Sequence, residues 1–319
     1  MFKKIRQPEL FQGHHRKNRY FEGWYFKSVT KDERLSLALI PGISLNRQDP
    51  HAFIQVFIAR HSDDDVELKT HYVRYDVDDF SYSRDVFRVQ IGTSIFSGDH
   101  IDIEIQHDNL DIRGRLDIKD RTPIEKSLLA PNIMGIFGYV GFMECYHGVI
   151  SMSHRLEGSL MINHQPVVFD DGKGYLEKDW GRSFPRAYVW MQSNHFKQPD
   201  TSFMCSYADI PFLGLFFKGL LANLVIAGKE YRFATYNGAR VLKEEIEKGK
   251  AVYLIKRGRL RLLIEAVTQK EIELASPRMG VMNETIKEGL SGKVTLTLWR
   301  GREQIYHDTG TSAGIEIMK

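Results

Sequence analysis

The sequence has little cysteine and no strong charge imbalance. Its 319 residues include only Cys145 and Cys205, and without a third cysteine or a metal-ligand spacing these predict reduced core residues rather than a disulfide framework or a zinc site. With 44 basic against 41 acidic residues, the formal net charge is only +3. This balance does not indicate a protein that binds nucleic acid.

Long hydrophobic runs are also missing. The longest apolar stretch, residues 211–228, is interrupted by Lys218, Asn223 and three glycines, and it falls short of the roughly 20 residues that a membrane-spanning helix needs. A second stretch, 127–143, is broken by proline and glycine. The N-terminus lacks the apolar segment of a secretory signal. We therefore expect a soluble, cytoplasmic protein in which either stretch could contact a membrane surface transiently or cover an apolar pocket.

Several catalytic fingerprints are absent, namely Gly-x-Ser-x-Gly, the phosphate-binding P-loop and Gly-x-Gly-x-x-Gly. Long helical periodicity is absent as well, whereas Ile101–Gln106 and Leu110–Ile118 alternate apolar and polar residues with period two. Many short strands with turns about every ten residues are typical of antiparallel barrels or sandwiches. The sequence therefore predicts an all-β fold with few short helices.

Two aromatic, acidic segments indicate an internal repeat. The segments that begin at Tyr20 and Tyr175 both read Tyr-x-Glu followed by Trp, and a Leu-x-Gly-x-apolar pattern recurs at Leu156 and Leu290. Because the two patterns come in the same order, they support a duplication. We place the boundary near residue 170, which predicts an N-terminal domain at 1–170 and a C-terminal domain at 171–319.

The segment after Tyr175 contains the first candidates for catalysis. Successive side chains of a strand point to opposite faces, so Glu177 and Asp179 share one face and Trp180 lies on the other. Desolvation among aromatic side chains raises the pKa of a carboxyl group, which makes it a usable general acid near neutral pH. Since Lys178 and Arg182 follow closely, a structural ion pair is the alternative for Glu177.

The next strand has an aromatic and amide face made of Tyr188, Trp190, Gln192 and Asn194. Large aromatic rings beside neutral amides suit a pocket that stacks an aromatic or isoprenoid ligand and hydrogen-bonds its oxygens. They suit equally well a partly buried barrel end whose amides bind backbone carbonyls. Both interpretations stay open on the residues alone.

An earlier strand has Glu144, Tyr146 and His154 on one face and Cys145 and His147 on the other. The first three could form an acidic, hydrogen-bonding edge of a pocket. Because the two histidines fall on opposite faces, we expect no two-histidine metal site within this strand.

Four segments together resemble the tocopherol cyclase family: Tyr20–Phe26, Glu177–Gly181, Phe184–Asn194 and the tail from Ile286 to Ile317. The resemblance covers nearly the whole chain. It implies two lipocalin-like antiparallel β-barrels in tandem, as in the related carotenoid hydratase-like and fungal Diels-Alderase-like proteins. The plant enzyme closes the chromanol ring of tocopherols from a phytyl benzoquinol, and the resemblance implies no redox cofactor and no metal.

That reaction protonates a trisubstituted alkene and lets a phenol oxygen capture the tertiary cation. Aromatic faces stabilise cations, and a carboxylic acid or a protonated histidine supplies the proton. The resemblance makes Glu177 the first candidate acid, ahead of Asp179, where the plant motif has Asn. The residues that would line the site are Trp180, Trp190, Gln192 and Asn194, with Glu22 and Trp24 on the matching face of the first barrel.

The leading hypothesis is therefore an enzyme, an intramolecular lyase or isomerase that acts on a lipophilic prenylated quinol or polyene by acid-initiated cyclisation or hydration. A lipocalin-like carrier that binds a hydrophobic small molecule without chemistry is the alternative, and an interaction protein with a collapsed pocket is the third. The expected partner is a hydrophobic small molecule, and no nucleic acid.

Overall fold

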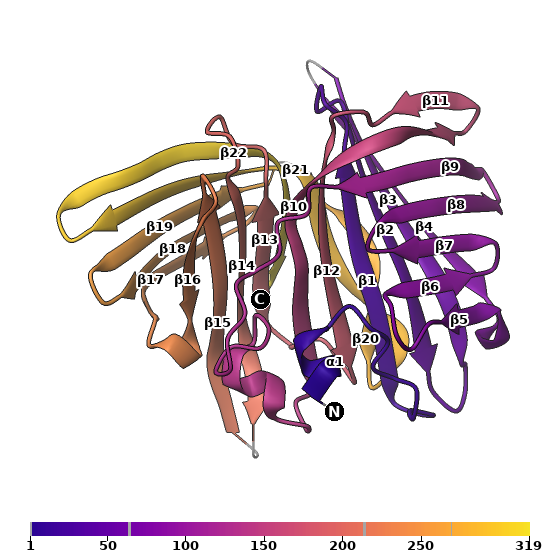
Figure 1. Cartoon of the computed structure of the whole chain (residues 1–319), viewed down its shortest axis with the longest axis horizontal. Helices are drawn as coiled ribbons and strands as arrows, with labels where there is room; N and C mark the ends of the chain where they lie inside the picture. Colours follow the sequence, from indigo (N-terminus) through magenta and orange to yellow (C-terminus); the bar gives the residue numbers. More distant parts are fainter. Residues whose placement is uncertain (1, 63–64, 213–214, 269) are drawn as a thin grey trace. The chain divides into compact units, whose positions relative to one another are not determined.

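A computed structural model describes residues 2–62, 65–212, 215–268 and 270–319. These residues form two large antiparallel sheets with very little helix (Figure 1), which confirms the predicted all-β fold. None of the helices among them is long and apolar enough to cross a membrane. The chain divides into two compact units. The first unit comprises Met1–Ile133, Glu144–Phe184 and Leu274–Thr285, and the second comprises Met134–Met143, Pro185–Glu273 and Ile286–Lys319.

The first sheet has the strand order β4-β3-β2-β1-β12-β10-β9-β8-β7-β6-β5, with β11 paired to β10. Its alternation follows the sequence: Ile101, Ile103 and Ile105 are buried, while Asp102 and Glu104 between them are not. The strands are β1 (Tyr20–Val29), β2 (Leu35–Leu45), β3 (His51–His61), β4 (Val66–Tyr75), β5 (Phe80–Tyr82), β6 (Arg88–Ile91), β7 (Ser94–Ser97), β8 (His100–His107), β9 (Leu110–Lys119), β10 (Cys145–Ile162), β11 (Gln165–Val168) and β12 (Lys173–Gly181). Two short helices, α1 (Phe2–Arg6) and η1 (Val77–Asp79), accompany them.

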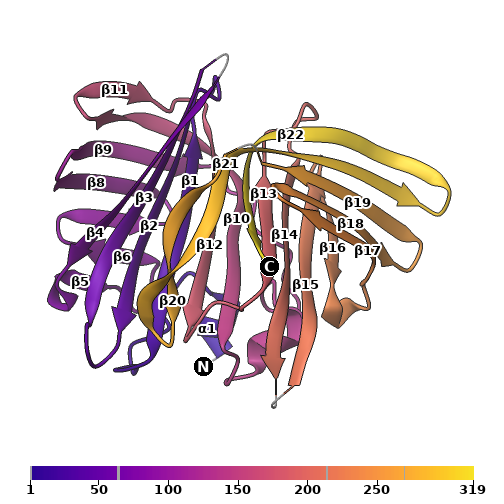
Figure 2. The same cartoon turned by 180° about the vertical axis from the view of Figure 1, so that it is seen from behind.

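The second sheet has the order β16-β15-β14-β13-β22-β21-β19-β18-β17, with β20 paired to β21 (Figure 2). Its strands are β13 (Tyr188–Ser193), β14 (Ser202–Phe212), β15 (Leu215–Ile226), β16 (Lys229–Ala234), β17 (Arg240–Glu247), β18 (Lys250–Arg257), β19 (Leu260–Val267), β20 (Ile272–Arg278), β21 (Val281–Arg300) and β22 (Glu303–Met318). The short helices η2 (Gly135–Tyr139) and η3 (Thr235–Asn237) belong to the second unit, whereas most of β20 and the start of β21 belong to the first. Each unit has its own hydrophobic core. The expected tandem of closed barrels stays a prediction.

The boundary expected near residue 170 falls inside the first unit. Strand β12 follows that position and pairs with both β1 and β10. The two aromatic motifs, which the sequence suggested as the openings of two domains, are therefore antiparallel neighbours in one sheet. Glu22 lies opposite Trp180, and Trp24 lies opposite Lys178. The chain enters the second unit at Met134–Met143, returns to the first for Glu144–Phe184, which includes β12, and then passes to the second again.

A buried ion pair between Glu22 and Lys178 links these two strands. Both side chains are fully buried. The Glu22 carboxylate accepts hydrogen bonds from the backbone N–H groups of Gln12, at 2.9 and 3.0 Å, and Gly13, at 3.0 Å, and from the Tyr20 hydroxyl. Because a buried charge is tolerated only when it is paired and hydrogen-bonded, these donors fix the segment before β1 against the sheet.

The ammonium group of Lys178 holds the same segment from the other side. It donates hydrogen bonds of 2.7 Å to the backbone carbonyls of Pro8 and Leu10. It also lies 4.7 Å from the ring centre of Trp24 and 4.8 Å from that of Trp180, within the range of cation–π attraction. Burial lowers the pKa of Lys178 to about 8, against the opposing effect of the Glu22 carboxylate.

We expect Lys178→Met to destabilise the protein by about 3–5 kcal/mol, because it leaves the buried Glu22 charge without its partner. Adding Glu22→Gln to that variant should recover part of the loss. Urea denaturation at pH 7 measures both. Lys69→Met is the matched control: its ion pair with Glu67 is half-exposed, so a change below about 1 kcal/mol is expected. Equal stability of Lys178→Met and the control would contradict the role of the ion pair.

Candidate functional site

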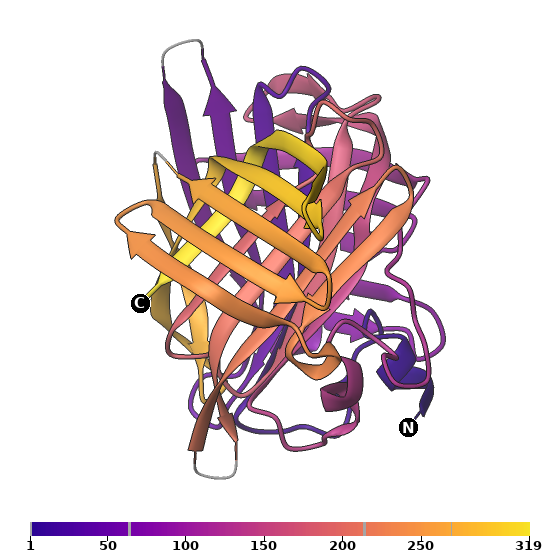
Figure 3. The same ribbon diagram turned by 90° about the vertical axis from the view of Figure 1, so that its left-hand side faces the viewer.

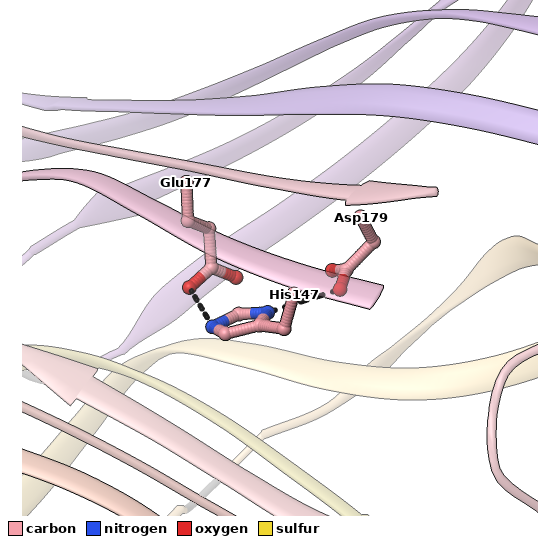
Figure 4. A group of neighbouring side chains, drawn as sticks. All are labelled: His147, Glu177 and Asp179. Atoms are coloured by element: carbon pink, nitrogen blue, oxygen red, sulfur yellow. Dashed lines mark hydrogen bonds and ion pairs between the residues drawn. The ribbon is translucent and has the colours of Figure 1, made fainter. Parts of the chain in front are cut away.

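On the face of β12 that points away from the first core, Glu177 and Asp179 meet His147 of β10 (Figure 4). The Nδ1 atom of His147 lies 2.9 Å from Oδ1 of Asp179, and its Nε2 atom lies 3.3 Å from Oε2 of Glu177. One imidazole ring thus bridges two carboxylates. The strand pattern had placed the two acidic side chains on one face, and the structure confirms that arrangement.

The strand register that brings these groups together depends on Gly181. Cys145 lies opposite Gly181, and His147 lies opposite Asp179. Gly181 has a φ of +147°, and a Cβ atom there would lie 2.2 Å from the backbone oxygen of Glu144. No side chain fits into that gap, so only glycine allows β10 and β12 to approach closely at this end. The glycine of the Asp-Trp-Gly sequence therefore has a backbone role.

Tyr175 extends the group into the interior. Its hydroxyl donates a 2.5 Å hydrogen bond to Oε2 of Glu177. The exposed fraction of the side chains falls along the series, from 25% for Asp179 to 13% for His147 and 5% for Glu177, while Tyr175 is fully buried. Two hydrogen bonds and the ion pair between His147 and Glu177 connect the four side chains in a series that runs from a partly exposed carboxylate to a buried phenol. We call these four residues the relay group.

The electrostatics of the relay group keep His147 protonated at neutral pH. Burial opposes charge on the imidazole, but the carboxylates of Glu177 and Asp179 outweigh it and raise the pKa of His147 to about 9. Burial and the neighbouring Glu177 raise the pKa of Tyr175 well above its usual value, so the phenol keeps its proton and acts as a donor. The group therefore stores a proton between two carboxylates at pH 7.

His147, Glu177 and Asp179 are also of the residue types that bind metal ions, and one donor atom from each lies within 4.8 Å of the others. The two nitrogens of the ring, however, face different carboxylates. A metal ion bound by all three residues needs one nitrogen directed at the point where both carboxylates converge. The observed orientation fits an imidazolium bridge better, and the expected absence of a metal cofactor stays a prediction.

Other predicted site residues of the first unit gather on the opposite face of β12. Glu22, Trp24 and Trp180 surround Lys178, and the ring of Tyr146 stacks on Trp180 with 5.3 Å between the ring centres. The indole N–H of Trp24 and the Glu22 carboxylate both bind the N-terminal segment. The structure thus separates these four residues from Glu177 and Asp179, and it gives the polar atoms of Glu22 and Trp24 partners within the protein.

The two remaining candidates of the first unit lie apart from the relay group. Glu144 is half-buried just before β10, and its backbone carbonyl accepts the N–H of Arg182 at 2.8 Å. His154 is buried beside Gly174, and its ring lies 3.2 Å from the Ser151 hydroxyl. Burial lowers the pKa of His154 to about 3, so its imidazole is neutral.

Four further candidates lie in the second unit and are all buried: Tyr188, Trp190 and Gln192 on β13, and Asn194 directly after it. Val189 and Met191, which alternate with them, belong to the core of that unit. Tyr188, Trp190 and Gln192 therefore share the face opposite that core, as the sequence pattern predicts for this strand. The Tyr188 hydroxyl donates a 2.6 Å hydrogen bond to Glu316 of β22.

The sequence interpretation missed His147, Tyr175 and Lys178 as members of these two clusters. Strand alternation could have supplied part of the signal, since it puts Lys178 on the face opposite Glu177. The partner of Glu177 became visible only with the pairing of β10 and β12.

Below pH 6.5 the raised pKa of His147 contributes its full stabilisation, and this contribution disappears as the pH rises through about 9. The shift corresponds to roughly 3 kcal/mol. His147→Gln should therefore lose most stability relative to the wild type at pH 6 and least at pH 10, as measured by urea denaturation across that range. Lys178 titrates in the same interval in both proteins, so the difference between them isolates His147. A difference that does not depend on pH would contradict the bridging imidazolium.

The sequence profile of the family described as Tocopherol cyclase-like matches residues 134–318. No curated protein matches the chain in sequence. Among solved structures, CghA is similar with a TM-score of 0.59 and 12% identity over 94% of this chain and 88% of that protein. A Nitrosomonas europaea protein assigned as AttH is similar with a TM-score of 0.51 and 16% identity over 94% of this chain and 93% of that one. These structural likenesses show a shared fold. The profile match covers more than half of the sequence and includes Glu177 and Asp179, and the chain belongs to the Tocopherol cyclase-like family.

Proposed function

We propose that this protein is an enzyme that acts on a lipophilic prenylated quinol or polyene by acid-initiated cyclisation or hydration. The observation that carries the proposal is the relay group, in which a protonated imidazole is hydrogen-bonded to Asp179 and ion-paired with Glu177, in the segment matched by the family profile. Such a group can hold a proton at neutral pH and deliver it without an external cofactor.

Binding of a lipophilic substrate would favour transfer of a proton from His147 to Glu177. An apolar ligand that covers the relay group displaces water, and desolvation disfavours charged forms. A proton transfer from the His147 imidazolium to the Glu177 carboxylate replaces two charges by two neutral groups. Glu177 then becomes a neutral carboxylic acid beside the substrate, which is the form that a general acid requires. This assigns the role of acid to Glu177 and the role of proton store to His147.

The proposed chemistry balances through proton movements alone. Glu177 gives its proton to an alkene carbon, and the π bond becomes a C–H bond and a tertiary cation. A phenol oxygen of the substrate, or a water molecule, then forms the new C–O bond and releases its proton to the Glu177 carboxylate. Cyclisation is therefore a net isomerisation, whereas capture by water is a net hydration.

The aromatic and amide face of β13 supplies groups of the kind that such a substrate needs. Tyr188 and Trp190 offer ring faces, which stabilise developing cations, and Gln192 and Asn194 offer donors for quinol oxygens. Binding of small molecules has a precedent in this fold, since CghA has also been solved with Sch210972. We propose these four residues as a binding face for a lipophilic ligand in the second unit. The internal partners of Glu22 and Trp24 support a structural role for that pair instead.

We expect Glu177→Gln to lower the turnover of a phytyl benzoquinol by about 10²–10⁴-fold, the usual contribution of a general acid, with little change in its Kd. The amide preserves the shape of the side chain but has no proton to donate to an alkene. Chromatography of extracted product and ligand fluorescence titration measure the two quantities. Glu157→Gln on the exposed part of β10 is the matched control and should turn over normally.

Two outcomes would contradict the proposal in different ways. Normal turnover by Glu177→Gln would remove the acid assignment. Stoichiometric binding by the wild type, with the ligand recovered unchanged after long incubation, would identify a lipocalin-like carrier of hydrophobic molecules. Native mass spectrometry of protein from its own cell, followed by lipid extraction, reads out the second outcome directly.

A further inference from the structure

One end of the second unit exposes a cluster of large apolar side chains. It is formed by the loop around η2 and by the hairpin of β14 and β15, which extends beyond the neighbouring strands of its sheet (Figure 3). The exposed fraction is 58% for Phe142, 76% for Leu215 and 63% for Phe216. We call the following six residues the apolar tip: Phe137, Phe142, Phe212, Leu215, Phe216 and Phe217. Residues 213–214 lie outside the described part of the chain and are not included.

Ring contacts join the loop to the hairpin. Phe137 stacks on Phe217 with 5.5 Å between ring centres, and Phe142 stacks on Phe212 at 5.6 Å. Phe212 in turn meets Phe217 edge-on at 6.1 Å. These ring contacts join the two segments that carry the exposed side chains of Phe142, Leu215 and Phe216. Single exposed apolar residues are common, but contiguous patches mark binding surfaces.

The chemistry of the apolar tip matches lipid hydrocarbon. Residues 127–143 and 210–217 contain no charged side chain, so a partner that recognises charge finds nothing to bind. Directly behind the tip, Lys218 lies 5.5 Å from the ring centre of Tyr207 and pairs with Asp209. Segments that enter a bilayer typically have apolar residues at their outer end and tyrosine and lysine next to them. These amphipathic residues then stay at the level of the lipid headgroups.

We propose that the apolar tip inserts into the surface of a lipid bilayer. A projecting hairpin suits a flat lipid surface, whereas a peptide ligand needs a groove. The proposal deepens the proposed function, because a lipophilic prenylated substrate dissolves in the bilayer and a docked enzyme can take it up from there. The docking step itself requires only the tip and involves no catalysis.

Flotation with phosphatidylcholine vesicles tests the docking. Leu215→Ser combined with Phe216→Ser should reduce the vesicle-bound fraction by at least about tenfold, since two large apolar side chains no longer reach the hydrocarbon. Leu242→Ser combined with Val267→Ser removes two exposed apolar residues from β17 and β19 of the same unit and should bind like the wild type. Salt at 0.5 M, about the strength that screens surface charges, should leave wild-type binding unchanged.

The proposal is overturned if the wild type does not float with vesicles, if both double variants bind equally, or if salt releases the protein. It is also overturned if sedimentation equilibrium shows a wild-type dimer that Leu215→Ser/Phe216→Ser converts to a monomer, because the tip is then an interface between copies. Turnover of a detergent-dispersed quinol separates the two proposals. A tip variant that loses docking should keep this turnover, and Glu177→Gln should lose turnover while it still docks.

Discussion

The alternation of side chains along β12 is the constraint on which both buried clusters depend. Within three consecutive residues the strand carries Glu177, Lys178 and Asp179, and its geometry sends the cation to one face and the two carboxylates to the other. Neighbours in sequence therefore cannot neutralise one another, and each face must find its partner on an adjacent strand. Glu22 of β1 forms an ion pair with Lys178, and His147 of β10 forms ion pairs with the two carboxylates.

The two faces of β12 offset the free-energy cost of burying charge in different ways. Around Lys178 the hydrogen-bonding capacity is filled by one carboxylate and two backbone carbonyls, which fixes the N-terminal segment. In the relay group the acidic groups outnumber the cation, and exposure increases toward Asp179. The imidazolium proton of the relay group has more than one carboxylate that can accept it, and this arrangement suits proton transfer. The ion pair of Lys178, whose hydrogen-bonding capacity is filled, instead stabilises the fold. This contrast is the physical reason to place chemistry on the side of Glu177.

The sequence was sufficient to predict those features that depend only on the alternation of side chains along a strand. Alternation at Ile101–Gln106 predicted the strands, and the same rule grouped Glu177 with Asp179 apart from Trp180. It was insufficient for pairing, because the register between β10 and β12 depends on a β-bulge near Val149 and on the close approach at Gly181. Strand pairing also decides how the two aromatic motifs relate: their similarity predicted two domains with a boundary near residue 170, and the strands that carry them, β1 and β12, pair in one sheet.

The raised pKa of His147 determines when the proposed mechanism can release its proton. An imidazolium with a pKa near 9 is too weak an acid to protonate an alkene by itself. In the free protein, the interactions that stabilise the charged imidazole therefore also make it a poor proton donor. Desolvation by a lipophilic substrate reverses that balance, since it penalises the imidazolium and the carboxylate together. The acid then forms only when the site is covered. Such coupling would keep the proton from water until the substrate is in place.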